Sequence, residues 1–260
     1  MPKIKAQPTA QISEGAVLAE GVEVGHYTVI GARVKIGRGT SIGDHCVITG
    51  NTTIGADNRI FTGAVIGSIP QDLKYKGEQT ELVIGDSNII REYVTINLGT
   101  SASGKTVIGS NSLIMAYAHV AHDCVVGNNV IIANVGTLAG HIVIEDRAII
   151  GGLAAIHQFV RIGTMAIVGG CARVNQDIPP YSMCYGQPAR VLGLNKVGLE
   201  RSGISPEAKA QLKSAFTILF NSGLTIPHAL EKVEKEIPSI PEVIYLLNFI
   251  KNSQRGVCRS

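Results

Sequence analysis

The chain has 260 residues, of which 45% are hydrophobic and only 5% aromatic, with 30 glycines and no tryptophan. This composition excludes a disordered protein and indicates a core of small and β-branched side chains packed in a regular way. The net charge of +3 comes from scattered basic residues, which argues against nucleic-acid binding as the main role.

The N-terminal segment does not resemble a signal peptide, and no segment is apolar over the length needed to cross a bilayer. We therefore expect a cytoplasmic protein without an integral membrane segment. The five cysteines are odd in number, widely spaced and without a CxxC pair, so a disulfide framework and a zinc knuckle are both disfavoured. We expect free, mostly buried thiols.

A six-residue repeat dominates the chain from Ile12 to Val174. Every sixth position of this span is Val, Ile or Leu, and the only exceptions are Asp72, Glu78 and Ala102. Apolar residues return every third or fourth position in a helix and every second position in a half-buried strand, so neither explains this period. The repeat predicts a triangular solenoid in which three six-residue units, each a short strand and a corner, make one coil.

This arrangement is typical of a left-handed parallel β-helix of hexapeptide repeats, a mainly β fold shaped as a triangular prism. Glycine follows many of the repeated aliphatic residues, as at Gly25, Gly37 and Gly109. We expect these glycines to turn the corners with unusual φ angles and without crowding the next coil. The polar segments 68–81 and 99–105 contain the three exceptions and keep the count in register, so they are predicted to be external loops.

The coil of three repeats also predicts which polar residues share an edge of the prism. His122, Gly140 and Gln158 follow one another at intervals of one coil and should form one column. Asp123 and His141 are separated by the same interval and should form a second column beside it. The sequence therefore places an imidazole, a carboxylate and a glycine amide at one edge.

Two further histidines join this region, because His119 lies three residues before His122 and His157 adjoins the same column. A single histidine on a polar wall is usually just solvated, whereas four of the seven histidines together favour a functional site. His122 could act as a general base, Asp123 could orient it, and the N–H of Gly140 could stabilise an oxyanion.

The repeat stops after Val174, and residues 176–191 form an exit segment rich in proline and glycine. A helical pattern begins at Ser205, a predicted N-cap followed by proline and glutamate. Two more helices are predicted over residues 225–236 and 241–251.

We therefore divide the chain into two domains. Residues 1–190 are predicted to form the β-helix with its external loops. Residues 191–260 are predicted to form a C-terminal α-helical domain that caps one open end of the prism.

Several segments together resemble the UDP-N-acetylglucosamine O-acyltransferase family, and the resemblance spans nearly the whole chain. The segments that carry it are QDLKYKGEQT (71–80), AHVAHDCVVG (118–127), LAGH (138–141), GGLAAIHQF (151–159), QDIPPY (176–181) and GLERSG (198–203). Several motifs in order make the resemblance more specific than one short motif would.

The resemblance implies transfer of an (R)-3-hydroxyacyl chain from acyl carrier protein to the 3-hydroxyl of UDP-N-acetylglucosamine, the first step of lipid A biosynthesis. It implies no metal and no redox cofactor. His122 would take the proton of the sugar hydroxyl, Asp123 would orient or polarise it, and Gly140 would offer its N–H to the oxyanion. Solenoids of this kind usually form homotrimers, which would place three sites at the subunit interfaces.

The same resemblance implies further contacts with the substrates. Residues that would bind the sugar, the diphosphate or the acyl portion are Gln71, Asp72, Lys74, His119, His141, His157 and Gln158. Nucleotide contacts would come from Asn195 and Arg201, although Val197 and Ser202 depart from the family's pattern beside them. Gly170 matches the position that sets acyl-chain length, where a bulky side chain would block the groove, but it could equally be a corner glycine.

Three other interpretations compete. His119, His122 and His141 could instead bind zinc between subunits, as in γ-class carbonic anhydrase, although their spacing is not that family's. The repeats could also form a non-catalytic scaffold. A related enzyme acylates a 2-amino group, but it carries an additional N-terminal domain, and here the repeats begin near Ile12.

Overall fold

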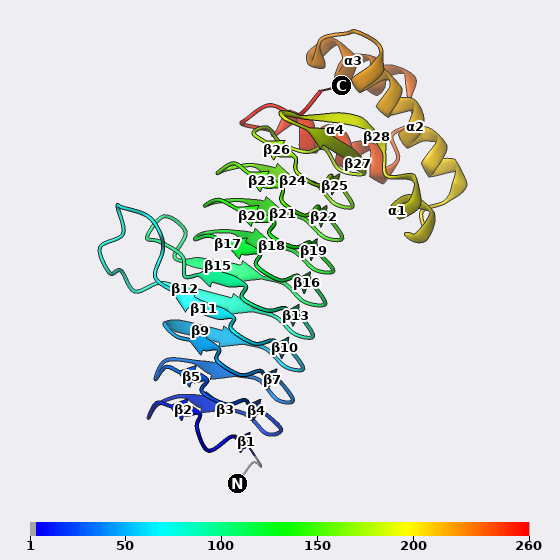
Figure 1. The fold of residues 1–260 in the computed structure, drawn as a ribbon. Helices are drawn as coiled ribbons and strands as arrows, with labels where there is room; N and C mark the ends of the chain where they lie inside the picture. Colours follow the sequence, from blue (N-terminus) through cyan, green and yellow to red (C-terminus); the bar gives the residue numbers. More distant parts are fainter. Residues whose placement is uncertain (1–3, 260) are drawn as a thin grey trace.

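The computed structural model describes residues 4–259 and contains a long prism followed by a small helical domain (Figure 1). Three sheets, called A, B and C here, form the faces of the prism, and successive strands of the chain join the three sheets in turn. Neighbouring strands within the prism are parallel. The prediction of a left-handed parallel β-helix is confirmed.

The strands of the prism are short, most of them two residues long. Sheet A contains β1 (Lys5–Ala6), β4 (Glu23–Val24), β7 (Ser41–Ile42), β10 (Arg59–Ile60), β13 (Ile89–Ile90), β16 (Leu113–Ile114), β19 (Ile131–Ile132), β22 (Ile149–Ile150), β25 (Ile167–Val168), β27 (Ser182–Gly186) and β28 (Ala189–Leu194). Sheet B contains β2 (Gln11–Ile12), β5 (Val29–Ile30), β8 (Val47–Ile48), β11 (Val65–Ser68), β14 (Thr95–Asn97), β17 (His119–Val120), β20 (Thr137–Leu138), β23 (Ala155–Ile156) and β26 (Arg173–Val174). Sheet C contains β3 (Val17–Leu18), β6 (Lys35–Ile36), β9 (Asn51–Ile54), β12 (Glu81–Ile84), β15 (Lys105–Ile108), β18 (Val125–Val126), β21 (Val143–Ile144) and β24 (Arg161–Ile162).

The pairing register shows both the regular coil and its two interruptions. His119 pairs with Thr137, three repeats later, as in a regular coil. Asn51 instead pairs with Glu81, two repeats beyond the length of a regular coil, and Glu81 pairs with Lys105, one repeat beyond it. Both insertions lie between a strand of sheet B and the next strand of sheet C, an edge that we call the B–C corner. They are the predicted external loops.

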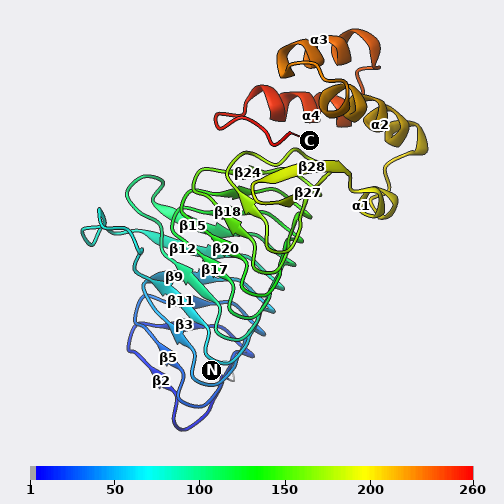
Figure 2. The ribbon, with the colours of Figure 1, turned by 45° about the horizontal axis from the view of Figure 1, so that its top comes forward.

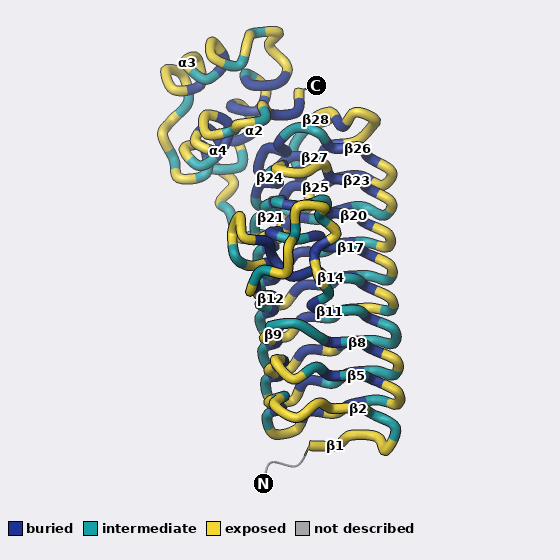
Figure 3. The backbone as a smooth tube through the Cα atoms, turned by 90° about the vertical axis from the view of Figure 1, so that its left-hand side faces the viewer, coloured by how far each residue is buried: buried dark blue, intermediate teal, exposed yellow. Residues whose placement is uncertain are grey.

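The aliphatic residue of each repeat fills the interior of the prism. Ile30, Ile48, Ile96 and Val120 are fully buried, and Figure 3 shows exposed residues recurring at the corners of successive coils. Each such burial is worth roughly 1.5–3 kcal/mol relative to an exposed side chain. Ile12 is an exception at 39% exposure, because it lies in the first coil, at the end of the prism.

The expected role of the corner glycines is half right. Gly37 does not have a positive φ angle, and the left-handed conformation occurs instead at the third residue of the corner, as at Tyr27 and Asp57 (φ 56° each). A Cβ on Gly37 would lie 2.5 Å from the carbonyl carbon of Gly55 in the next coil. Glycine is required there by the close stacking of the coils, whereas its φ angle is ordinary.

The exit segment contains structure that the sequence did not predict. Strand β27 continues sheet A and forms an antiparallel hairpin with β28. A short helix, α1 (Lys196–Arg201), follows directly. The division into domains at residue 190 stays a prediction, and β28 runs across that position.

The three predicted C-terminal helices are confirmed as α2 (Pro206–Asn221), α3 (Ile226–Glu236) and α4 (Pro241–Lys251). The hydroxyl of Ser205 caps α2 by accepting a hydrogen bond from the N–H of Ala208. Figure 2 shows these helices gathered beyond the last coils. No helix among the described residues is long and apolar enough to cross a membrane. The five cysteines are free, and all except Cys171 are buried, as expected.

Candidate active site

Both external loops and the histidine cluster lie along the B–C corner. Residues 69–80 and 98–104 leave this corner in successive coils (Figure 1), and the corner of the next coil contains His122 and Asp123. The predicted stacking holds, because the N–H of His141 donates to the His122 carbonyl at 3.0 Å. Residues from separate coils therefore meet at one edge.

His122 and Asp123 form a hydrogen-bonded pair. Nδ1 of His122 lies 2.7 Å from Oδ2 of Asp123. The Asp123 side chain is fully buried, and the His122 side chain is 12% exposed. Because Nδ1 faces the carboxylate, the imidazole keeps Nε2 available for proton transfer to a substrate.

The second loop encloses the Asp123 carboxylate. Its two oxygens accept hydrogen bonds from the N–H of Thr100 at 2.9 Å, from the Thr100 hydroxyl at 2.7 Å and from the hydroxyl of Ser103. Burial by itself would raise the pKa of this carboxyl, but the hydrogen bonds from Ser103, His122 and Thr100 outweigh it and lower the pKa to about 2. Asp123 is therefore ionised at neutral pH.

His141 completes the cluster from the next coil. Its Nε2 lies 3.7 Å from Oδ2 of Asp123, and its ring meets that of His122 edge-on, with centroids 5.1 Å apart. Phe159 stacks on the ring of His141 with centroids 4.5 Å apart. These contacts fix the ring of His141 beside the buried carboxylate.

Gly140 leaves room for the imidazole of His122. A Cβ at this position would lie 2.5 Å from Cε1 and 2.7 Å from Nε2 of His122. Among the described residues, the N–H of Gly140 donates to no acceptor. The structure thus places an unused backbone donor next to the imidazole.

The remaining predicted histidines lie at the same edge but outside this contact network. Nδ1 of His119 lies 2.7 Å from the hydroxyl of Thr95, and burial together with the nearby His122 lowers the His119 pKa. His157 is exposed, and its Nδ1 lies 3.2 Å from the Gln158 carbonyl oxygen. The Gln158 side chain is also exposed.

The first loop carries Gln71, Asp72 and Lys74. Asp72 accepts a hydrogen bond from the N–H of Lys74 at 2.9 Å, which closes a tight turn. The base of the loop is tied to the prism, because the amide of Asn97 donates to the Ile69 carbonyl at 3.0 Å. No hydrogen bond or ion pair of the described chain joins these three predicted residues to the histidines.

The two predicted tail residues, Asn195 and Arg201, do not lie at the B–C corner that contains His122. Asn195 is buried and caps α1, with Oδ1 accepting from Gly198 and Nδ2 donating to the Met165 carbonyl, each at 2.9 Å. Met165 belongs to the corner between sheets C and A. Arg201 is exposed at the end of α1. A contact of either residue with a nucleotide stays a prediction.

Gly170 lies at the third edge, between β25 and β26. It is exposed, and a Cβ there would meet only the Gly152 carbonyl oxygen, at 3.3 Å. A side chain could therefore be added at this position while the prism is kept.

The cluster also has the donor types of a metal site. Ligand atoms of His122, Asp123 and His141 all lie within 4.8 Å of one another. His119 does not belong to this group, so the three-histidine set considered from the sequence is not the one that the fold assembles. A metal would have to replace the hydrogen bond between His122 and Asp123.

Four residues of the site were not predicted, namely Thr95, Thr100, Ser103 and Thr106. Thr106 accepts a hydrogen bond from the N–H of Asp123 at 2.9 Å. Thr95 and Thr106 lie on strands and follow the repeat, since Thr95 precedes His119 by one coil, counted with the extra repeat of the second loop, and Thr106 belongs to β15. Loop residues follow no period, so Thr100 and Ser103 could not be placed.

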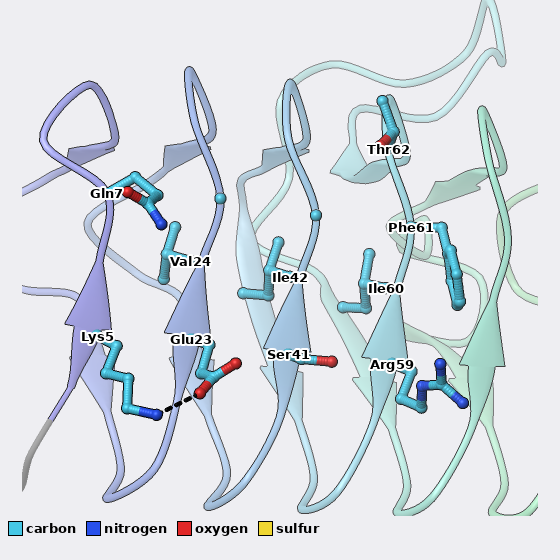
Figure 4. Close-up of a pocket in the computed structure, with 12 residues that line it drawn as sticks. Lys5, Gln7, Glu23, Val24, Ser41, Ile42, Arg59, Ile60, Phe61 and Thr62 are labelled. Carbon is cyan, nitrogen blue, oxygen red and sulfur yellow. Dashed lines mark hydrogen bonds and ion pairs between the residues drawn. The ribbon is translucent and has the colours of Figure 1, made fainter.

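A separate shallow groove lies on sheet A near the N-terminus (Figure 4). It is lined by residues of β1, β4, β7 and β10, and the Lys5–Glu23 ion pair at 2.8 Å lies at its β1 end. The guanidinium of Arg59 lies 5.4 Å from the ring centroid of Phe61 at one end. The groove contains none of the predicted site residues.

Comparison with known proteins agrees with this geometry. Residues 177–258 match the family description "Udp N-acetylglucosamine O-acyltransferase; Domain 2", and residues 105–136 match "Bacterial transferase hexapeptide (six repeats)". A Chlorobaculum tepidum protein named acyl-(acyl-carrier-protein)--UDP-N-acetylglucosamine O-acyltransferase is 61% identical over 93% of this chain and 92% of its own. A protein of the same name from Thermodesulfovibrio yellowstonii is 53% identical over 96% of this chain and 98% of its own.

The similarity extends to three dimensions. The crystal structure of a UDP-N-acetylglucosamine acyltransferase from Bacteroides fragilis superimposes with a TM-score of 0.95. The two chains are 44% identical, and the match covers 97% of this chain and 99% of the other.

Proposed function

The chain belongs to the UDP-N-acetylglucosamine O-acyltransferase family, and we propose that it transfers an (R)-3-hydroxyacyl group from acyl carrier protein to the 3-hydroxyl of UDP-N-acetylglucosamine. The chain is an acyltransferase, and its reaction is the first step of lipid A biosynthesis. The observation that carries the proposed mechanism is the pairing of His122 with the buried, ionised Asp123.

In this mechanism His122 is the general base. Its Nε2 takes the proton of the sugar hydroxyl while the hydroxyl oxygen attacks the carbonyl carbon of the thioester. The tetrahedral intermediate collapses when the C–S bond breaks, and the imidazolium returns the proton to the departing thiolate. One ester and one thiol replace one thioester and one alcohol, so no oxidant or reductant is needed.

Asp123 and Gly140 support the charges that appear during this reaction. The buried carboxylate accepts from Nδ1 of His122, so it fixes the tautomer and stabilises the imidazolium. The N–H of Gly140, next to the imidazole and without an acceptor among the described residues, is suited to the oxyanion.

The proposed substrate contacts need a second copy of the chain. We propose that residues of the first loop and of the B–C corner bind the sugar, diphosphate and acyl portions, as the resemblance implies. These residues are Gln71, Asp72, Lys74, His119, His141, His157 and Gln158. Arg201 ends helix α1, whose cap Asn195 is bonded to the corner between sheets C and A, and Gly170 lies at the edge between sheets A and B. We propose that both reach the substrate from a neighbouring subunit. The homotrimer and the cytoplasmic location expected from the sequence are part of this proposal.

Gly170 belongs to the same proposal as the residue that sets acyl-chain length. With only hydrogen at this position no side chain blocks the groove, which favours a longer acyl chain if sterics alone decide.

The experiment is to incubate the purified protein with UDP-N-acetylglucosamine and a mixture of 3-hydroxyacyl carrier proteins and to identify the product by mass spectrometry. We expect a 3-O-acylated sugar nucleotide, formed equally well in the presence of EDTA. His122→Ala should lower the rate by roughly 10²–10⁴-fold, the usual contribution of a general base. His228→Ala, at an exposed histidine of α3, is the matched control and should keep full activity.

Two results would contradict this proposal. Full activity of His122→Ala would show that His122 is not the general base, whereas no acylated product from the unaltered chain would favour the scaffold interpretation. Loss of activity in EDTA, restored by zinc, would favour the metal interpretation.

A further inference from the structure

We infer that Thr100 and Ser103, on the loop of residues 98–104, are positioning residues that hold Asp123 in line with His122. The inference rests on the proposed role of His122 as general base. It assigns a function to the one-repeat insertion that interrupts the coil before the histidine.

Asp123 is unusual for the place that it occupies. It is the third residue of its corner and has the left-handed conformation of such residues, with φ 60°. The corresponding residues Asp57 and Asn129 are exposed, whereas Asp123 is only 4% exposed. The difference comes from the loop, whose Thr100 and Ser103 contact the carboxylate.

The hydrogen bonds leave the carboxylate a single orientation. Oδ1 accepts from the N–H of Thr100 and from the hydroxyl of Ser103, and Oδ2 accepts from the hydroxyl of Thr100 and from Nδ1 of His122. A carboxylate offers about four acceptor positions, so all of them are used. Rotation of the Asp123 side chain would break its hydrogen bonds to the loop. The loop therefore keeps the remaining acceptor position of Oδ2 directed at Nδ1 of His122.

The donors also keep the carboxylate charged. Removal of a carboxylate from water raises its pKa, and donors from the loop and from His122 reverse that effect. The other titratable side chains beside this pair are His119, His141 and the buried thiol of Cys124. None of them is a lysine or an arginine, so the loop hydroxyls and the Thr100 N–H are the donors to Asp123 that do not depend on protonation.

The test compares variants of the full chain in the acyl-transfer assay across a range of pH. Thr100→Val and Ser103→Ala each remove a donor, and Thr100→Ser keeps it. Ser101→Ala is the matched control, because Ser101 is an exposed neighbour on the same loop and forms no hydrogen bond among the described residues. Chain assembly and circular dichroism of each variant show whether the fold is kept.

We expect the double variant T100V/S103A to lose roughly 10- to 100-fold in kcat, part of what a positioned base contributes. Its acid limb of kcat/KM should move to lower pH, because a carboxylate that the loop no longer holds in line with Nδ1 of His122 stabilises the imidazolium less. Thr100→Ser should restore most of the rate, and Ser101→Ala should match the unaltered chain. A general loss of fold would lower the rate without moving the acid limb.

The inference is overturned if the folded double variant keeps both its kcat and its acid limb while His122→Ala is inactive. If His122→Ala is itself active, the proposed function fails instead, so the two failures are distinguishable. If the Thr100→Val chain does not assemble, Ser103→Ala alone tests the same inference, because it removes a single hydroxyl that donates to Asp123. The acid limb of kcat/KM of this variant should also move to lower pH.

Discussion

Asp123 is a buried, ionised carboxylate, and each of the groups that stabilise its charge can be named: Thr100, Ser103 and His122. The carboxyl has a pKa of about 2 in the folded chain against an ordinary value of 3.8, because hydrogen bonds outweigh burial. A group whose pKa is lowered by folding stabilises the fold above its ordinary pKa and loses this effect as the pH falls through the folded value. The relevant window is therefore pH 4 to pH 2.

We predict that Asp123→Asn removes this pH dependence. The difference in unfolding free energy between the unaltered chain and the variant should be larger at pH 5 than at pH 2. The size of the pKa change sets this increase at about 2 kcal/mol. Denaturant unfolding at one protein concentration and several pH values measures the difference. Asp57→Asn, at the third residue of an exposed corner, is the matched control. A gap of constant size at both pH values would contradict the prediction.

Part of the site could be predicted from the sequence, because in a solenoid the spacing of residues along the chain determines which of them stack on adjacent coils. His122, Asp123, Gly140 and His141 occupy one edge since residues one coil apart stack on each other, and their contacts follow from that stacking. The donors on the loop could not be found in this way, because the chain outside the prism has no fixed spacing. Thr100 looks like any polar loop residue until its contact with Asp123 is seen.

At the scale of elements, the periodic parts of the chain could again be predicted and the non-periodic parts could not. The strands from β2 to β26 and the three long helices are set by periodic apolar residues, and they were predicted. The hairpin of β27 and β28 buries Cys184, Ala189 and Val191, a short alternation interrupted by a turn at Gln187 and Pro188. Helix α1 has only six residues, too few to show a helical period.

The second loop has a length that permits a clean test of its role. The corner of a regular coil has four residues, as at 121–124 between β17 and β18. Deletion of residues 99–104 would join Leu98 to Lys105 and leave the regular four-residue corner 97, 98, 105 and 106.

We predict that this deletion keeps the prism and abolishes acyl transfer. Far-ultraviolet circular dichroism and chain assembly should resemble those of the full chain, because β12 and β15 would still pair across one coil. The rate should fall by at least about 10²-fold, since Asp123 would lose its loop donors. A folded deletion variant with normal activity would show that the loop is dispensable.

At the scale of the whole molecule, the predicted substrate contacts lie on three different edges of one rigid prism. His122 is at the B–C corner, Arg201 follows a helix cap bonded to the corner between sheets C and A, and Gly170 is at the edge between sheets A and B. Parallel strands stacked along the whole length do not allow these edges to approach one another. Under the proposed roles of these residues, a complete site is one in which edges of different copies meet.

This requirement predicts that two inactive variants restore activity to each other. His122→Ala and Arg201→Ala chains, co-expressed with different affinity tags and purified through both, would form mixed trimers. A site needs His122 from one chain and Arg201 from its neighbour, so every trimer that contains both kinds of chain has one intact site out of three. The doubly purified sample should therefore recover roughly a third of the full acyl-transfer rate. Trimers that pair His122→Ala with the double variant H122A/R201A contain no intact base and should stay inactive. If the co-assembled single variants are no more active than the separate ones, the two residues do not serve a shared site, and the proposed interface between copies is wrong.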